Sequence, residues 1–243
     1  MREPFYELGE HIAIELPDAR ALFTTRRGGF SSGPYESLNL GRRTDDDPTA
    51  VARNRAVLHD QVGVEPRFVW QVHGSRVMQI REGEPGPHEP ARADGHATKR
   101  RDLAPSVLVA DCLPVAIAGD GAVAMLHAGW RGLAGAVIAA GVEALGDLGA
   151  QGPYAAAIGP GAGPCCYEVG AEVHETFAEL PAAVHIGRKL DLKAIARHEL
   201  LRAGVAKVDD VGICTICSEP ALLFSHRRDR GVTGRQAGVA WLI

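Results

Sequence analysis

The sequence has few of the features that mark membrane, secreted or nucleic-acid-binding proteins. No apolar run approaches the roughly 20 residues that a membrane-spanning helix needs. The N-terminal residues lack the basic and then apolar pattern of a secretory signal. Only 5 cysteines are present, and a chain of this length does not need a disulfide scaffold. We therefore expect a cytoplasmic protein with reduced thiols and no membrane partner.

An excess of positive charge is also absent. The formal net charge is -4 and the isoelectric point is about 6.2, so the whole chain shows no electrostatic footprint for nucleic acid. Hydrophobic residues make up 46% and charged residues 23%, which is ordinary for a globular protein with a sizeable core. A length of 243 residues fits one large α/β domain or two small ones. Small anions such as phosphate stay candidate ligands, because arginines cluster locally.

Apolar strands alternate with helical patterns along the chain, which indicates an α/β fold. Strands are expected in residues 11–24, 67–72, 76–81, 107–110, 115–118, 123–126, 154–158, 211–216 and at the C-terminus. Helices are expected from residue 48 onward and in residues 133–148, 172–180 and 192–203. The turn signal at residues 119–121 (GDG) predicts a hairpin between its flanking strands. Glycines and prolines in residues 82–93 predict an exposed, irregular loop.

Three side chains of metal-ligand type follow apolar, strand-like segments. His73, Cys112 and His127 each stand at or next to the end of such a segment, with a glycine or proline close behind. A single cysteine in an apolar strand is usually an inert core residue, and the spacing matches no short zinc motif. The shared setting nevertheless favours convergence, because sites form where the backbone leaves a sheet. One cysteine, two histidines and an open fourth position make a recognised catalytic zinc arrangement.

Arginines beside glycines supply candidate anion sites. Arg26 lies in residues 24–29 (TTRRGG), and Arg131 lies in the turn 129–132 (GWRG), which opens a helix. Backbone N–H groups and guanidinium groups in such turns can hold phosphate. Arg227 belongs to a further cationic cluster near the C-terminus. Residues 24–29 fit a solvated hairpin loop better than an anion site, and the C-terminal cluster fits a solvated charged loop equally well, whereas the turn 129–132 favours an anion site because it opens a helix.

The remaining cysteines carry weaker signals. Residues 214–217 (CTIC) contain a lone C-x-x-C, which without a second pair is a weak indication of metal or redox chemistry. The neighbouring Cys165 and Cys166 carry no clear message, and we assign them no role.

Several short motifs occur in one order from about residue 21 to the C-terminus. They are residues 24–29, 37–41 (SLNLG), 71–74 (QVHG), 110–114 (ADCLP), 127–132 (HAGWRG), 158–160 (IGP), 166–169 (CYEV), 214–215 and 224–229 (FSHRRD). Together they resemble the YfiH-type family, also called the laccase-domain or multicopper polyphenol oxidase family. Members of this family also carry the names purine nucleoside phosphorylase and peptidoglycan editing factor.

The resemblance implies a single α/β domain over residues 1–243, with mixed β-sheets flanked by helices. It implies a zinc ion bound by His73, Cys112 and His127. The implied reactions are phosphorolysis of adenosine, inosine and methylthioadenosine, together with deamination of adenosine. A purine nucleoside and phosphate are then the partners, and we expect a monomer or a homodimer.

Site roles follow from the same resemblance. Cys112, His127 and Arg131 are the expected catalytic residues. Arg26, Asn39 and Arg227 are the expected substrate-binding residues, and an arginine would cradle the phosphate. The acid that protonates the purine is not identifiable from the sequence, and Asp111 and Glu168 are the two carboxylates considered.

Two other function classes stay open at this point. One is a cysteine or metal amidase that edits peptidoglycan precursors; in the cysteine form, Cys112 would be the thiolate nucleophile and His127 or His73 its base. A copper polyphenol oxidase is the weaker alternative, because the 10 histidines include no H-x-H pair. A site with one cysteine and two histidines would still take copper readily in vitro.

Three positions depart from the family pattern. His96 stands in residues 94–98 (DGHAT), where the family tends to have an apolar residue. Ala196 and Glu199 replace the asparagine and glutamine that are usual after a pair such as residues 191–192 (DL). These departures concern details of substrate contact and leave the three metal-ligand candidates intact.

Overall fold

Two six-stranded β-sheets form the centre of the computed structural model, which describes residues 3–81, 83 and 91–243. The first sheet has the order β1-β2-β3-β14-β7-β4: β1 (Tyr6–Leu8), β2 (His11–Leu16), β3 (Ala19–Phe23), β14 (Gln236–Leu242), β7 (Leu103–Val109) and β4 (Glu65–Phe68). The second has the order β13-β10-β8-β9-β6-β5: β13 (Val205–Asp210), β10 (Tyr154–Ile158), β8 (Leu113–Gly119), β9 (Ala122–Ala128), β6 (Gly95–Thr98) and β5 (Val77–Ile80). Both sheets mix parallel and antiparallel pairs.

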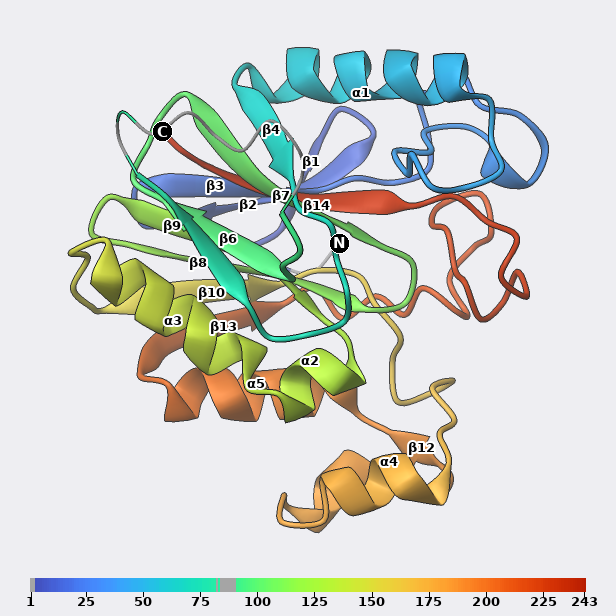
Figure 1. The fold of residues 1–243 in the computed structure, drawn as a ribbon. Coiled ribbons are helices and arrows are strands. Elements are labelled where there is room, and N and C mark those ends of the chain that lie inside the picture. The colour runs from blue at the N-terminus through green and yellow to red at the C-terminus, as the bar shows by residue number, and fades with distance from the viewer. Residues whose placement is uncertain (1–2, 82, 84–90) are drawn as a thin grey trace.

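Helices cover the outer faces of the two sheets, so that the molecule has four layers (Figure 1). The helices are α1 (Pro48–Val62), α2 (Trp130–Ala134), α3 (Val137–Asp147), α4 (Ala171–Thr176) and α5 (Leu192–Arg202), with 3-10 turns η1 (Gly33–Tyr35) and η2 (Ala182–Val184). Helix α1 lies over the first sheet, and α3 and α5 lie over the second. A small ribbon of β11 (His185–Ile186) and β12 (Lys189–Leu190) lies beside α4. No helix among the described residues is long and apolar enough to cross a membrane.

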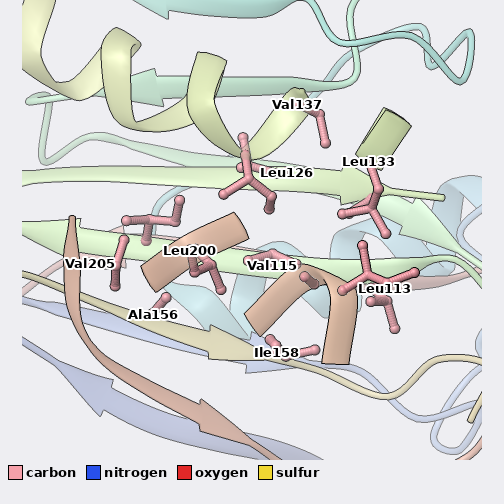
Figure 2. Close-up of a cluster of buried hydrophobic side chains, with 14 of the residues drawn as sticks. Leu113, Val115, Leu126, Leu133, Val137, Ala156, Ile158, Leu200 and Val205 are labelled. Carbon is pink, nitrogen blue, oxygen red and sulfur yellow. The ribbon is translucent and has the colours of Figure 1, made fainter. Parts of the chain in front are cut away.

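The central hairpin of the second sheet is buried on both faces. In β8, Leu113, Val115 and Ile117 pack toward the helices, and the intervening alanines pack toward the other sheet. Figure 2 shows the helix-side cluster, in which Leu126 of β9 joins residues of β8, β10 and the helices. Burial on both faces explains the nearly continuous apolar sequence of these strands.

The hairpin predicted from residues 119–121 is confirmed. Strands β8 and β9 pair antiparallel, and both turn residues, Asp120 (φ 50°) and Gly121 (φ 66°), have positive φ. Two positive φ values are characteristic of the tight turns that match strand twist. The pairing places Leu113 opposite Ala128, so the segments that carry Cys112 and His127 lie side by side.

The chain passes between the two sheets at the end of the hairpin away from this turn. Strand β7 of the first sheet leads through residues 110–112 to β8 of the second. Strand β4 of the first sheet leads through residues 69–76 to β5 of the second. Both crossings carry candidate ligands, so these side chains can meet where backbone leaves both sheets.

Several sequence-based boundaries are wrong. The expected helix 133–148 is two helices, because Ala136 has a left-handed φ of 64° and interrupts the hydrogen-bond ladder. The expected strand 211–216 is not a strand; β13 ends at Asp210, and the apolar residues that follow form an irregular segment and then a turn. The strand expected at 67–72 ends at Phe68, so His73 lies in a crossing segment rather than at a strand end. Most of the loop expected at 82–93 lies outside the described residues.

Candidate functional site

His73, Cys112 and His127 converge on one point. Their ligand atoms all lie within 4.8 Å of one another, and the two imidazole rings meet edge to face with centroids 4.9 Å apart. His127 is buried in β9, Cys112 is half-buried and His73 is exposed. The sequence-based grouping of these three side chains is therefore matched by their positions in the fold.

Unusual backbone conformations place two of these side chains. His73 has a φ of 59°, which turns the crossing segment sharply, and Asp111, just before Cys112, has a φ of 91°. Non-glycine residues rarely adopt positive φ and do so mainly where the surrounding structure enforces it. Gly129 leaves room for the thiol, because a Cβ there would lie 2.8 Å from Cys112 Sγ.

A buried carboxylate orients both histidines. Asp94 Oδ1 lies 2.8 Å from His127 Nδ1 and accepts the backbone N–H of His73 at 2.9 Å. Its other oxygen accepts the backbone N–H groups of Val72 and Gly74. With Nδ1 of His127 directed at the carboxylate, Nε2 is left to face Cys112.

The electrostatics of the pair favour a thiolate. Burial acts to raise the pKa of Cys112, but the imidazoles of His127 and His73 outweigh it and lower that pKa to about 6. Burial acts to lower the pKa of His127, but the Cys112 thiolate and Asp94 outweigh it and raise that pKa to about 9. A thiolate is both the nucleophilic form of cysteine and the form that binds metals.

The donor set and its surroundings fit a zinc ion. Two imidazoles and one thiolate are zinc ligands in catalytic sites, where a fourth position stays open. The Asp94–His127 contact is the outer hydrogen bond that metal-binding histidines regularly make. Cys112 faces a cavity, so a fourth ligand has access from that side.

A cavity of about 570 Å³ opens next to the three side chains. Its lining includes six arginines: Arg42, Arg43, Arg55, Arg131, Arg227 and Arg235. It also includes four aromatic residues: Phe68, Trp70, Trp130 and Tyr167. Asp111 is the acidic residue in this lining, so the charge of the described wall is strongly positive.

Arg131 and Arg227 are both in the cavity wall, as the sequence analysis expected. The guanidinium of Arg131 lies over the ring of Trp130 at 4.3 Å, and that of Arg227 lies over Tyr167 at 4.9 Å. Arg227 also donates to the carbonyl oxygen of Glu168. These stacked guanidinium groups are held beside the aromatic surface, with donor groups left for an anion.

Arg26 and Asn39 lie elsewhere. The guanidinium of Arg26 donates to the carbonyl oxygens of Pro34 and Pro220 and lies over Phe224, and Arg26 is not in the described cavity lining. Asn39 is fully buried and binds Thr44 and other groups of its own loop. Both residues therefore stabilise loops, and Asn39 acts on the loop that carries Arg42 and Arg43.

Sequence reasoning missed three arginines of the cavity wall: Arg42, Arg43 and Arg55. Arg43 lies over the ring of Trp70 at 3.4 Å, and both side chains are part of the cavity wall. Burial, together with the charge of Arg42, lowers the pKa of Arg55 to about 10. The local signal was the pair Arg42–Arg43 after Gly41, which is the same arrangement of arginine beside glycine that was noted elsewhere.

The two carboxylates considered as acids differ in position. Asp111 lines the cavity, where it accepts the hydroxyl of Thr215 at 2.6 Å and the backbone N–H of Arg227 at 2.7 Å. Glu168 points to Arg188, with N and O atoms 3.9 Å apart. Only Asp111 of the two is in the described lining of the cavity.

The fold and site define a single-domain α/β protein with a two-histidine, one-cysteine cluster at a cationic cavity. Residues 20–243 match the family model described as multi-copper polyphenol oxidoreductase laccase. The chain therefore belongs to this family, as its motifs suggested.

Curated relatives match nearly the whole chain. A protein of Corynebacterium glutamicum is 39% identical over 234 residues, which cover 92% of this chain and 94% of the relative. A protein of Pseudomonas aeruginosa is 39% identical over 92% of this chain and 93% of its own length. Escherichia coli YfiH is 37% identical with the same two coverages. All three are named purine nucleoside phosphorylases.

Solved structures share the fold. YfiH of Bacillus licheniformis superposes with a TM-score of 0.92 at 30% identity and covers 100% of both chains. YlmD of Geobacillus stearothermophilus has a TM-score of 0.88 at 32% identity, with 98% of this chain and 97% of that chain covered. The expected α/β fold with mixed sheets flanked by helices is thereby confirmed.

Proposed function

We propose that this protein is a zinc-dependent purine nucleoside phosphorylase acting on adenosine, inosine and methylthioadenosine, and that it also deaminates adenosine. The observation that carries the proposal is the opening of the His73–Cys112–His127 cluster into a cavity lined by arginines and aromatic rings. Arginine side chains can bind phosphate, and aromatic rings give a purine a flat apolar surface to stack on. The printed names of the relatives support the same reaction.

His73, Cys112 and His127 would hold the zinc ion. A zinc ion with an open position supplies Lewis acidity and activates water at neutral pH, which deamination of adenosine requires. Asp94 keeps the ring of His127 oriented and stabilises positive charge on it. This leaves Nε2 of His127 and the thiolate of Cys112 directed at the same point.

The cationic wall would hold the phosphate. Arg131 and Arg227 project from different segments into one cavity, so one anion can receive hydrogen bonds from both. A phosphate fixed there lies ready for attack on C1′ of the ribose, where positive charge develops. Asp111 is our candidate for the group that protonates the purine, because it is the carboxylate in the described lining.

The amidase hypothesis gives Cys112 another role. A thiolate beside an imidazolium is a competent nucleophilic pair, and the pKa directions of Cys112 and His127 are compatible with it. In that role His73 would only help to lower the pKa of Cys112, whereas a metal ion would use it as a third ligand, since its ligand atom lies within 4.8 Å of the other two. The copper reading rests on the family description alone, since a multicopper centre needs many more imidazoles than the two in this cluster.

The decisive experiment measures the products formed from adenosine in the presence and in the absence of phosphate. We expect adenine and ribose 1-phosphate to form only when phosphate is present, and inosine and ammonia to form without it. The Cys112→Ala variant should lose both activities. Equal release of adenine without phosphate would make the reaction a hydrolysis and contradict the phosphorylase assignment. Full activity in Cys112→Ala would contradict the role of the metal cluster.

A further inference from the structure

The four cysteines outside the candidate metal centre also come together. Cys165, Cys166, Cys214 and Cys217 place their Sγ atoms within 4.8 Å of one another. Two of them come from the turn after β10 and two from the turn after β13. Neither the reaction proposed above nor the cavity uses these thiols.

Parallel pairing of two strands brings the pairs together. Strands β10 and β13 are parallel neighbours, so their carboxyl ends meet at the same edge of the sheet. The pairing continues past the strands, since Gly161 bridges Cys214 and accepts the N–H of Thr215 at 3.1 Å. Each strand then turns, and each turn presents two thiols to the other.

We propose that these four thiolates form a second, structural metal site that binds zinc. Structural zinc sites are closed and tetrahedral, and four cysteines are one of their common ligand sets. With Zn–S bonds of about 2.3 Å, a tetrahedron separates its sulfur atoms by roughly 3.8 Å. The Sγ atoms of Cys165 and Cys217 are 3.4 Å apart, near that value and well beyond the roughly 2.05 Å of a disulfide.

Backbone donors around Cys214 fit a metal-bound thiolate. The N–H of Gly163 donates to Cys214 Sγ at 3.2 Å, and the backbone N–H groups of Ile216 and Cys217 are also directed at this sulfur. Hydrogen bonds to ligand sulfur offset the negative charge that four thiolates leave around a divalent ion. Lys189 adds a cation beside the site, because its Nζ donates to the carbonyl oxygen of Cys165 at 2.6 Å.

Solvent access suits loading of the ion. Cys165 and Cys217 are exposed, whereas Cys166 and Cys214 are half-buried. A metal ion can therefore enter from the surface and complete its shell with the inner pair.

The second site would brace the cavity wall. Cys166 directly precedes Tyr167, which lines the cavity. Beside Cys214, the hydroxyl of Thr215 donates to Asp111, and its carbonyl oxygen accepts from Arg228 at 2.9 Å. An ion shared by the two turns would fix both segments relative to each other. The role is structural, so it does not depend on the reaction proposed above.

The test removes the first site and counts zinc at the second. Purified Cys112→Ala protein, loaded with zinc under reducing conditions and then desalted, should retain about one equivalent of zinc per chain. Adding Cys214→Ser and Cys217→Ser to that background should remove it. Adding Glu219→Gln instead, at an exposed position of the same turn, should leave the zinc content unchanged.

Loading with cobalt supplies a spectroscopic readout. Co²⁺ in the Cys112→Ala protein should give the intense thiolate charge-transfer absorption of a tetrahedral site, and Cys217→Ser alone should weaken it. Cys217 is exposed, so that substitution leaves the core packing intact. If the triple variant with Cys112→Ala, Cys214→Ser and Cys217→Ser does not fold, a mercurial titration of the Cys112→Ala protein serves instead. Release of zinc in step with reaction of the four thiols is then the expected result.

Two outcomes would overturn the proposal. The first is a folded Cys112→Ala protein that retains no zinc or cobalt while its four thiols are reduced. The second is a disulfide between Cys165 and Cys217 in protein isolated without reductant, with no metal bound after reduction. That second outcome would make the cluster a redox pair.

Discussion

Asp94 Oδ1 lies 2.8 Å from His127 Nδ1, so a fully buried carboxylate orients one histidine of the candidate metal centre from behind. The same side chain accepts three backbone N–H groups from the segment that carries His73. One residue of the β5–β6 connection thus joins β9 of the second sheet to the segment that crosses between the two sheets.

Asp94→Asn should weaken zinc binding at this centre. The amide removes the negative charge behind His127 and one of the acceptors used by the His73 segment, so we expect roughly 10- to 100-fold lower affinity. Competition against a chelator of known affinity measures the change. Asp60→Asn, at an exposed position of α1, is the matched control and should bind zinc as the wild type does. Unchanged affinity in Asp94→Asn would show that the carboxylate only supports the backbone.

Cys112 should be protected from alkylation by bound zinc. A thiolate coordinated to a metal reacts slowly with iodoacetamide, and chelation should expose it as a reactive group because its metal-free pKa is about 6. Peptide mapping distinguishes Cys112 from the four other cysteines. Rapid modification of Cys112 that is the same before and after chelation, with parallel loss of activity, would favour the amidase reading.

Arg131→Ala should raise the KM for phosphate. Loss of one charge-assisted hydrogen bond costs about 1.5–3 kcal/mol, which corresponds to roughly a tenfold to hundredfold change. Initial rates at varied phosphate measure it, and saturating phosphate should recover most of the rate. Arg202→Ala, an exposed arginine of α5 outside the described cavity lining, is the control. A loss of rate that does not depend on phosphate would instead indicate that Arg131 supports the docking of α2.

His96 should make the protein less stable in mild acid. Burial lowers the pKa of His96 from 6.5 to about 4, so the unfolded chain takes up a proton at a higher pH than the folded protein does. The contribution of neutral His96 to the free energy of unfolding is therefore fully present above pH 6.5, the pKa of the unfolded chain. It falls as the pH drops from 6.5 toward 4, with a limiting slope of about 1.4 kcal/mol per pH unit.

Urea unfolding of wild type and His96→Gln across this pH range isolates that contribution. Glutamine keeps an acceptor for the N–H of Ser106, which donates to His96 Nε2 at 2.9 Å, and it does not titrate. We expect a shallower loss of stability for the variant. Identical slopes for the two proteins would mean that other groups account for the acid sensitivity.

Short sequence signals correctly predicted turns and helix ends that a few neighbouring residues determine. The turn at Asp120 and Gly121 fixed the β8–β9 hairpin, and helix α5 ends before Gly204, whose φ is 86°. The prediction of secondary structure failed where contacts between distant segments determine the conformation. Residues 211–216 are as apolar as a strand, but this segment instead follows β13 and forms the turn of the cysteine cluster. The helix break at Ala136 did have a local signal, because Gly135 caps α2, but glycine also occurs inside α3 and so did not mark the break by itself.

The residues alone indicated the α/β class, the two-histidine, one-cysteine grouping and the arginine turns, because residue type and short spacing are properties of single segments. Arg26 and Arg131 look alike in the sequence, because both belong to short segments rich in arginine and glycine, and only the fold directs one to loop carbonyl groups and the other to the cavity. The vicinal cysteines at 165–166 and the C-x-x-C at 214–217 likewise carried little meaning apart. The parallel pairing of β10 with β13 joins them, and such pairing depends on contacts between distant segments that no local pattern specifies.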